Sequence, residues 1–172
     1  MKKYILLFRG INVGGRNLLP MKDLKTLLLG AGYEQIETYI QSGNVVLQSQ
    51  QPPNDDIREL MEQEFGFKPE LIVLDEPLLM DAINSNPFEA DEGKHMHFFF
   101  LADKPRPDQE KLTQLATASE QFLVTDSVFY LYAPDGIGRS KLAAKVEACL
   151  GVSGTGRNLN TVNKLVDMLG DK

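Results

Sequence analysis

The stretch Arg9–Asn17, RGINVGGRN, holds the residues of this chain most suited to chemistry. It places two arginines near the ends of a glycine-rich turn. Backbone N–H groups and guanidinium groups together suit the binding of an anion. We therefore predict a ligand-binding turn formed by Arg9, Asn12, Gly14, Gly15, Arg16 and Asn17.

This turn almost matches the phosphate-binding loop of nucleoside triphosphatases. Gly10 and Gly15 have the required spacing, but Arg16 replaces the lysine and Asn17 replaces the hydroxyl residue that binds magnesium. The expected helix also begins only at Pro20, several residues later. The pattern favours simple anion binding over nucleotide hydrolysis. The structural alternative is a tight turn whose arginines pair with carboxylates.

Two more polar motifs extend the predicted ligand-binding set. QSGN lies between two strand-like runs, and GRN precedes the last helix. Asparagine and serine also stabilise turns by bonding to their own backbone, so a structural role is equally open. A cation ahead of a helix is locally unfavourable, which suggests a partner for the arginine elsewhere. The residues added are Gln41, Ser42, Gly43, Asn44, Arg157, Asn158, Thr161 and Lys164.

Other reactive residues give weaker signals. His95 and His97 share one face of a strand, but no cysteine or nearby carboxylate completes a recognisable ligand set, so we expect no metal site. Cys149 lies in the middle of a predicted helix and is expected in the core. A single cysteine forms no internal disulfide and fits a reducing cytoplasm, which is the predicted location. No general base is evident, so catalytic residues and any cofactor stay unknown.

The elements that must position the first two motifs follow from periodicity. Apolar and turn patterns predict a strand, a helix, two strands, a helix and a strand, at residues 3–9, 20–31, 35–40, 45–48, 54–65 and 70–74. This βαββαβ order is the ferredoxin-like plan. In that plan the first and second strands run the same way. The turn Arg9–Asn17 and the hairpin Ile40–Val45 should therefore lie at the same end of the sheet. Residues 4–8 are apolar on both faces, so both faces should be covered.

The second half repeats part of this plan. Helices are predicted at residues 76–84, 108–118, 142–150 and 160–169, and strands at 95–101, 121–124 and 128–132. GVSGTGRN, before the last helix, is expected to be a loop. We predict an α+β protein of two packed ferredoxin-like units, at residues 1–75 and 76–172, the second a diverged copy with extra helices.

Composition limits the function classes. The 172 residues carry a net charge of −6, which argues against a protein that coats nucleic acid. Charge is uneven, at +3 over residues 1–50, −10 over 51–120 and +3 over 136–172, so the polar motifs lie in basic segments. No apolar run approaches the roughly 20 residues that span a bilayer, and we expect no membrane partner.

Several motifs together resemble a known family. RGINVGG, YIQSGNVV, NPF, GIGRSKL and TGRNLNTVNKL occur in this order over nearly the whole chain. In these features the chain resembles a bacterial family of conserved cytoplasmic proteins, domain-of-unknown-function family 1697. The resemblance implies a pair of packed ferredoxin-like units and supplies no activity.

The sequence thus favours a cytoplasmic protein that binds a small anionic or phosphorylated ligand near the glycine turn. One alternative is a metal-independent enzyme that uses the same pocket. The other is an interaction module for protein or nucleic acid, without catalysis. Nucleic acid is the less favoured partner, and the oligomeric state is open.

Overall fold

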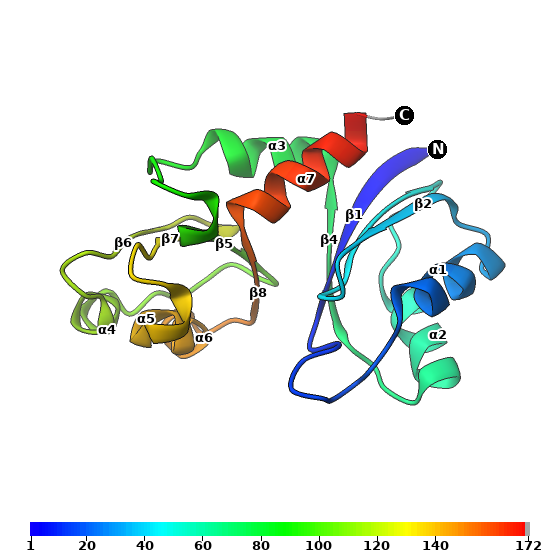
Figure 1. Ribbon diagram of the computed structural model, residues 1–172, viewed down its shortest axis with the longest axis horizontal. Coiled ribbons are helices and arrows are strands. Elements are labelled where there is room, and N and C mark those ends of the chain that lie inside the picture. Colours follow the sequence, from blue (N-terminus) through cyan, green and yellow to red (C-terminus); the bar gives the residue numbers. More distant parts are fainter. Residues whose placement is uncertain (171–172) are drawn as a thin grey trace. The chain divides into compact units, whose positions relative to one another are not determined.

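The computed structural model describes residues 1–170 and divides the chain into two compact units (Figure 1). Unit 1 comprises Met1–Asp81 and the end of the chain from Leu165, and unit 2 comprises Ala82–Lys164. Each unit contains one four-stranded antiparallel sheet with helices packed on it. In the described part of the chain, every helix is too short or too polar to span a bilayer.

Unit 1 has the predicted βαββαβ order. Its sheet has the strand order β2-β3-β1-β4, and β1 pairs antiparallel with both β3 and β4. This is the ferredoxin-like arrangement, and it confirms the fold class. The elements are β1 (Lys2–Arg9), α1 (Met21–Gly30), β2 (Glu34–Tyr39), β3 (Asn44–Ser49), α2 (Asp55–Phe65) and β4 (Glu70–Asp75), followed by α3 (Glu76–Asn84).

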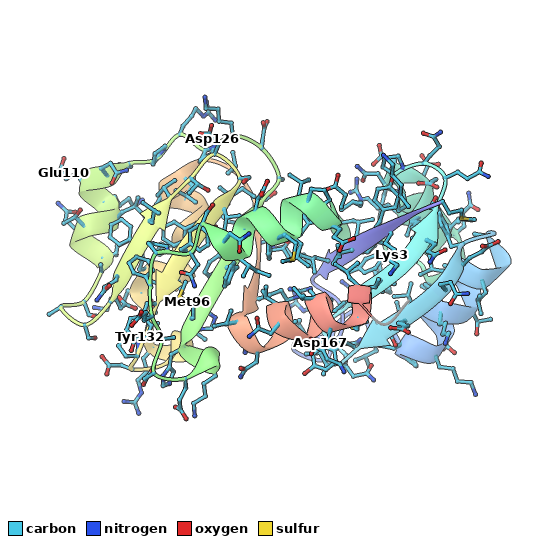
Figure 2. All side chains as sticks on the ribbon, turned by 90° about the horizontal axis from the view of Figure 1, so that it is seen from above. Lys3, Met96, Glu110, Asp126, Tyr132 and Asp167 are labelled. Atoms are coloured by element: carbon cyan, nitrogen blue, oxygen red, sulfur yellow. The ribbon has the colours of Figure 1, made fainter. Side chains whose placement is uncertain are left out.

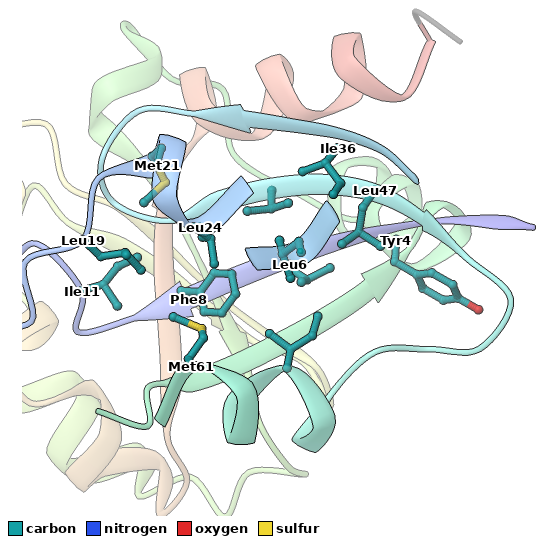
Figure 3. Packing of buried hydrophobic residues seen from close by; sticks show 13 residues of the cluster. Tyr4, Leu6, Phe8, Ile11, Leu19, Met21, Leu24, Ile36, Leu47 and Met61 are labelled. Atoms are coloured by element: carbon teal, nitrogen blue, oxygen red, sulfur yellow. The ribbon is translucent and has the colours of Figure 1, made fainter. Parts of the chain in front are cut away.

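The core of unit 1 lies between this sheet and the helices α1 and α2 (Figure 3). Leu24 of α1 and Met61 of α2 pack with Leu6 and Phe8 of β1, and all four are fully buried. The intervening residues of β1, Ile5 and Leu7, are also fully buried. Both faces of β1 are therefore shielded from water, as its apolar sequence predicts.

Unit 2 contains the same topology. Its sheet has the order β6-β7-β5-β8, in which β5 occupies the place of β1. Figure 2 labels Met96 and Tyr132, which pair at one end of β5 and β7. The elements are η1 (Gly93–His95), β5 (Met96–Leu101), α4 (Gln109–Leu115), β6 (Gln121–Val124), β7 (Val128–Tyr132), η2 (Ile137–Arg139), α5 (Lys141–Ala144), α6 (Val146–Leu150), β8 (Gly154–Asn158) and α7 (Leu159–Gly170), whose last turns belong to unit 1.

Two expectations for unit 2 were wrong. The predicted helix 142–150 is interrupted at Lys145, which separates α5 from α6. The predicted loop before the last helix contains β8, which pairs with β5. Its glycines misled the assignment, since glycine is depleted in strands. At Gly156 a glycine avoids crowding, because a Cβ atom there would lie 3.0 Å from the ring of Phe99. With β8 in place, unit 2 is a complete second βαββαβ unit.

The core of unit 2 forms between its sheet and the helices α4, α5 and α6. Phe129 and Leu131 of β7 pack there with Leu112 and Leu142. Cys149 joins this cluster, as expected, and burial raises the pKa of its thiol. Phe98 and Phe100 are buried as well, and Phe98 meets Tyr130 edge to face at 5.2 Å between ring centroids. These phenylalanines are core residues rather than an exposed stacking platform.

Candidate functional site

The glycine turn is a miniature hairpin at the end of β1. The backbone N–H of Arg16 donates to the carbonyl of Val13 at 3.0 Å, and that of Asn12 donates to Asn17 at 3.1 Å. Gly14 and Gly15 form the two-residue loop, with φ values of +60° and +74°. Left-handed backbone at both central positions is typical of tight hairpin loops and favours glycine there.

One side chain, that of Asn12, holds the turn in place. Its Oδ1 accepts a hydrogen bond from the N–H of Leu19 at 2.6 Å. Its Nδ2 donates to the carbonyl oxygens of Leu19 and Gln41, both at 2.8 Å. The carboxamide of Asn12 thus ties the two ends of the turn to the hairpin between β2 and β3.

The same hairpin contacts the turn through Gly43. The N–H of Phe8 donates to the carbonyl of Gly43 at 2.9 Å. A Cβ atom on Gly43 would lie 2.7 Å from Cδ1 of Ile11, a fully buried residue of the turn. The turn therefore packs directly on the hairpin, and the predicted meeting of the two motifs is confirmed.

The two arginines of the turn differ in their surroundings. Arg9 donates to Oε2 of Glu70 at 2.8 Å, which is the carboxylate pairing that the structural alternative proposed. Arg16 is exposed, and its guanidinium has no hydrogen bond or ion pair within residues 1–170. Of the two, Arg16 is the one left available to bind an anion.

The other asparagines of the predicted site have structural partners. Nδ2 of Asn17 donates to the carbonyl of Gly10 at 2.9 Å. Asn44 is fully buried, and its Nδ2 donates to the carbonyl of Tyr39 and to Oγ of Ser42, both at 3.1 Å. These side chains shape the loops, as expected of asparagine in turns.

Three exposed aliphatic side chains at the same end of unit 1 were missed by the sequence interpretation. Val13, Leu18 and Ile40 are 61%, 70% and 50% exposed. Ile40 has a φ of +48°, which is unusual for a β-branched residue. The available signal was the presence of large apolar residues in otherwise polar turns, without a helical or strand period.

The remaining predicted residues lie in unit 2, in β8 and at the start of α7. Oδ1 of Asn158 accepts a hydrogen bond from the N–H of Thr161 at 3.0 Å and so caps α7. Arg157 donates to the carbonyl of Gly156, and burial lowers its pKa to about 10. The participation of Arg157 and Lys164 in a site with the glycine turn stays a prediction.

Unit 2 also contains a polar cluster that the sequence interpretation overlooked. Nδ1 of His95 lies 3.1 Å from Oδ1 of Asp91 and 3.9 Å from Oε2 of Glu92, so nearby carboxylates do exist. These three side chains could offer ligand atoms to a cation. Tyr132 also donates to Asp91 at 3.1 Å, so Asp91 has hydrogen-bond contacts with both His95 and Tyr132.

His97 lies in the sheet of unit 2. It is buried, and its Nε2 has no hydrogen-bond partner within the described chain. Burial, with a smaller contribution from nearby His95, lowers the pKa of His97 to about 4. The ring is therefore neutral at pH 7.

Comparison with known proteins identifies similar sequences and folds. A family model described as "Protein of unknown function (DUF1697)" matches residues 1–130. The conserved bacterial protein SP0830 from Streptococcus pneumoniae has a similar fold, with a TM-score of 0.67 and 22% identity over 98% of each chain. No curated protein gives a significant match.

Proposed function

The chain belongs to the family of proteins of unknown function DUF1697, and we propose that it binds an anionic or phosphorylated ligand at the glycine turn. The exposed guanidinium of Arg16, which has no hydrogen-bond or ion-pair partner among the described residues, is the observation that carries the proposal. Arginine binds phosphate and carboxylate groups through two parallel hydrogen bonds.

The backbone of the turn supports the same role. The N–H groups of Gly14 and Gly15 have no hydrogen-bond partner within the described residues, and neither residue would bring a side chain between them and a ligand. No acidic residue occurs from Gly10 to Lys22, so the local charge favours an anion. We assign contact with the ligand to Arg16 and to these two N–H groups.

Other residues of the predicted set position this turn. Asn12 fixes its ends, Asn17 closes its base, and Gly43 allows the hairpin to approach. Arg9 is engaged by Glu70. Residues 10–19 and 40–44 contain no histidine, cysteine or acidic residue, so the turn and the hairpin offer no side chain of the usual kinds that serve as a general base. Binding without catalysis is therefore the better supported of the two roles for this turn.

A thermal unfolding screen tests the proposal. Inorganic phosphate, glycerol phosphate, sugar phosphates and nucleotides would each be added to the chain and to Arg16→Ala. A ligand at 100 times its dissociation constant stabilises the folded state by about 2.7 kcal/mol, which raises the melting temperature of a chain of this size by several degrees. We expect at least one compound to do so in the unmodified chain and not in Arg16→Ala.

Lys25→Ala is the matched control, because Lys25 is an exposed cation on α1 of the same unit. It should retain the ligand-induced shift. Equal shifts in all three proteins would place the binding elsewhere, and the absence of any shift across the panel would contradict the proposal.

A further inference from the structure

The glycine turn, which carries Arg16, and the neighbouring hairpin expose three aliphatic side chains. Asn12 bonds to Leu19 and Gln41. The exposed aliphatic residues are the sequence neighbours of these three: Val13 follows Asn12, Leu18 precedes Leu19, and Ile40 precedes Gln41. We call Val13, Leu18 and Ile40 the aliphatic tip.

The chain separates buried from exposed apolar residues sharply in this region. Ile11 and Leu19 are buried, whereas Val13 and Leu18 are mostly exposed. The other large exposed apolar side chains of the described residues occur on separate elements, at Met1, Leu29, Leu78, Leu123 and Ile137. Scattered apolar residues need no explanation, but a group held on two anchored loops does.

We propose that the aliphatic tip docks on an anionic phospholipid bilayer, with Arg16 at the level of the lipid phosphates. This rests on the proposed function, since it makes the phosphorylated ligand a lipid headgroup. The expectation of no membrane partner was based on the absence of a spanning segment, whereas docking at the surface needs no such segment and depends on exposed apolar side chains and basic residues.

Charge and size favour a bilayer over other partners. The loops 10–19 and 40–43 contain one basic residue and no acidic residue. Three aliphatic side chains are few for a stable protein interface, which usually involves some 20 to 30 residues on each side. The tip also lacks the aromatic side chains on which nucleic-acid bases stack. The chain's net charge of −6 is screened beyond about 8 Å at physiological ionic strength, so it does not prevent contact of the tip with anionic lipid.

Co-sedimentation with vesicles tests this docking. The full chain should bind vesicles of equimolar phosphatidylcholine and phosphatidylglycerol, and bind vesicles of phosphatidylcholine alone much more weakly. The double variant Val13→Ser, Leu18→Ser should lose at least about ten-fold in affinity, because two apolar side chains no longer leave water. Arg16→Ala should lose the preference for the anionic vesicles.

Leu29→Ser is the matched control, since Leu29 is 52% exposed on α1 of the same unit. It should bind as the unmodified chain does. The double variant replaces exposed side chains only, so its melting temperature should stay unchanged and a loss of binding cannot be attributed to unfolding.

A fluorescent reporter gives independent evidence. The chain contains no tryptophan, so Leu18→Trp introduces a single tryptophan fluorophore at the tip. Its emission should shift to shorter wavelength with anionic vesicles, and that of Leu29→Trp should not. No shift in either variant overturns docking by the tip.

The remaining outcomes separate this inference from the proposed function. If soluble phosphate compounds stabilise the protein and vesicles do not bind, bilayer docking is overturned and anion binding stands. If neither binds, both are overturned. Binding of a single-stranded oligonucleotide in place of vesicles, or equal binding to both vesicle types, also overturns the inference.

Discussion

The two units have the same sheet topology but differ in the loops at one end of the sheet. In unit 1 the N–H of Phe8, near the end of β1, donates to the carbonyl of Gly43 at 2.9 Å. In unit 2 the N–H of Leu101, at the end of β5, donates to the carbonyl of Ser127 at the same distance. These bonds join equivalent strands to equivalent hairpins, so the two sheet ends can be compared residue by residue.

The connection that follows each first strand accounts for the difference. In unit 1 the glycine turn folds over the hairpin and is tied to it by Asn12. In unit 2 the connection runs to α6 instead, where the N–H groups of Arg106 and Asp108 donate to Leu150 and Cys149 at 2.7 and 2.9 Å. Its exposed side chains are charged apart from Ala102 and Pro107, and it has no counterpart of the aliphatic tip.

The comparison shows that the fold alone does not create the candidate site. Both units share the strand order and the strand-to-hairpin bond. Only unit 1 adds a turn that displays a cation and apolar groups on an anchored backbone. The function of a common fold resides in such additions, and substitutions at equivalent places in the two units can test this.

The largest effect is expected from Gly43→Ala. The new Cβ would lie 2.7 Å from Cδ1 of Ile11 and 2.9 Å from Cβ of Phe8, at a φ of +92°. Overpacking and left-handed backbone together should lower the free energy of unfolding by about 3 kcal/mol. Urea denaturation would measure it.

Ser127→Ala, at the equivalent position of unit 2, is the control. Ser127 is exposed and already carries a Cβ, so its truncation should change the free energy of unfolding by less than about 0.5 kcal/mol. Similar losses of unfolding free energy in both variants would show that the two hairpins are packed alike, which would contradict the difference between the two units.

Asn12→Ala should have the next largest effect. It removes three hydrogen bonds that involve Leu19 and Gln41, and it leaves alanine at a φ of +56°. We expect a loss of about 2 kcal/mol in the free energy of unfolding, together with loss of ligand binding, because the turn is no longer held. Unchanged hydrogen exchange in the turn would refute this anchoring role.

One pair of equivalent positions in the two sheets holds a histidine in unit 2 and a tyrosine in unit 1, and we expect a pH effect from the histidine. His97 pairs with Leu131 of β7, and its counterpart Tyr4 pairs with Leu47 of β3. The pKa of buried His97 is lowered to about 4, so an unfolded chain binds a proton below about pH 6.5 that the folded chain does not. The free energy of unfolding should therefore fall as the pH decreases from 6.5 toward 4, by about 1.5 kcal/mol between pH 6.5 and pH 5.

His97→Gln should remove this part of the pH dependence, since the amide does not titrate in this range. Unfolding measured in urea at several pH values between 4 and 7 would show it. The resonance of His97, identified by its absence from His97→Gln, would contradict the assignment if it titrated near pH 6.5 in the folded protein.

Much of the fold could be predicted because its signals are local. The apolar run of β1, the period of α1 and the hairpin at Ser42-Gly43 gave the βαββαβ order, and this order brought the glycine turn to the hairpin. β8 could not be predicted in this way. Its glycines lie against side chains of β5, Gly154 against Leu101 and Gly156 against the ring of Phe99, and these contacts appear only once the strands are paired.

The position of the glycine turn beside the hairpin could be predicted, but the partners of its side chains could not. The sequence places arginine, asparagine and glycine in one turn, but it does not reveal which residues elsewhere in the chain bond to them. Arg9 finds Glu70, 61 residues later, and Asn12 finds Gln41. Both partners come from other elements, so the distinction between Arg9 and Arg16 depends on tertiary structure.

A smaller effect than that of Gly43→Ala is expected from Gly14→Val, at one of the two glycines assigned to contact the ligand. Its φ is +60°, but nothing lies within 4 Å of a Cβ placed there. Only backbone strain opposes the substitution, which should cost about 1 to 2 kcal/mol, less than the crowded Gly43→Ala. Thermal or urea unfolding would measure the difference between the two.

Gly14→Asn separates strain from function at this position. Asparagine tolerates left-handed backbone better than valine, so this variant should lose only a few tenths of a kcal/mol. If the N–H groups of Gly14 and Gly15 contact the ligand, a side chain at residue 14 should still weaken the ligand-induced shift in melting temperature. A stable Gly14→Asn protein with undiminished binding would remove the glycine N–H groups from the site and leave Arg16 as its one assigned contact.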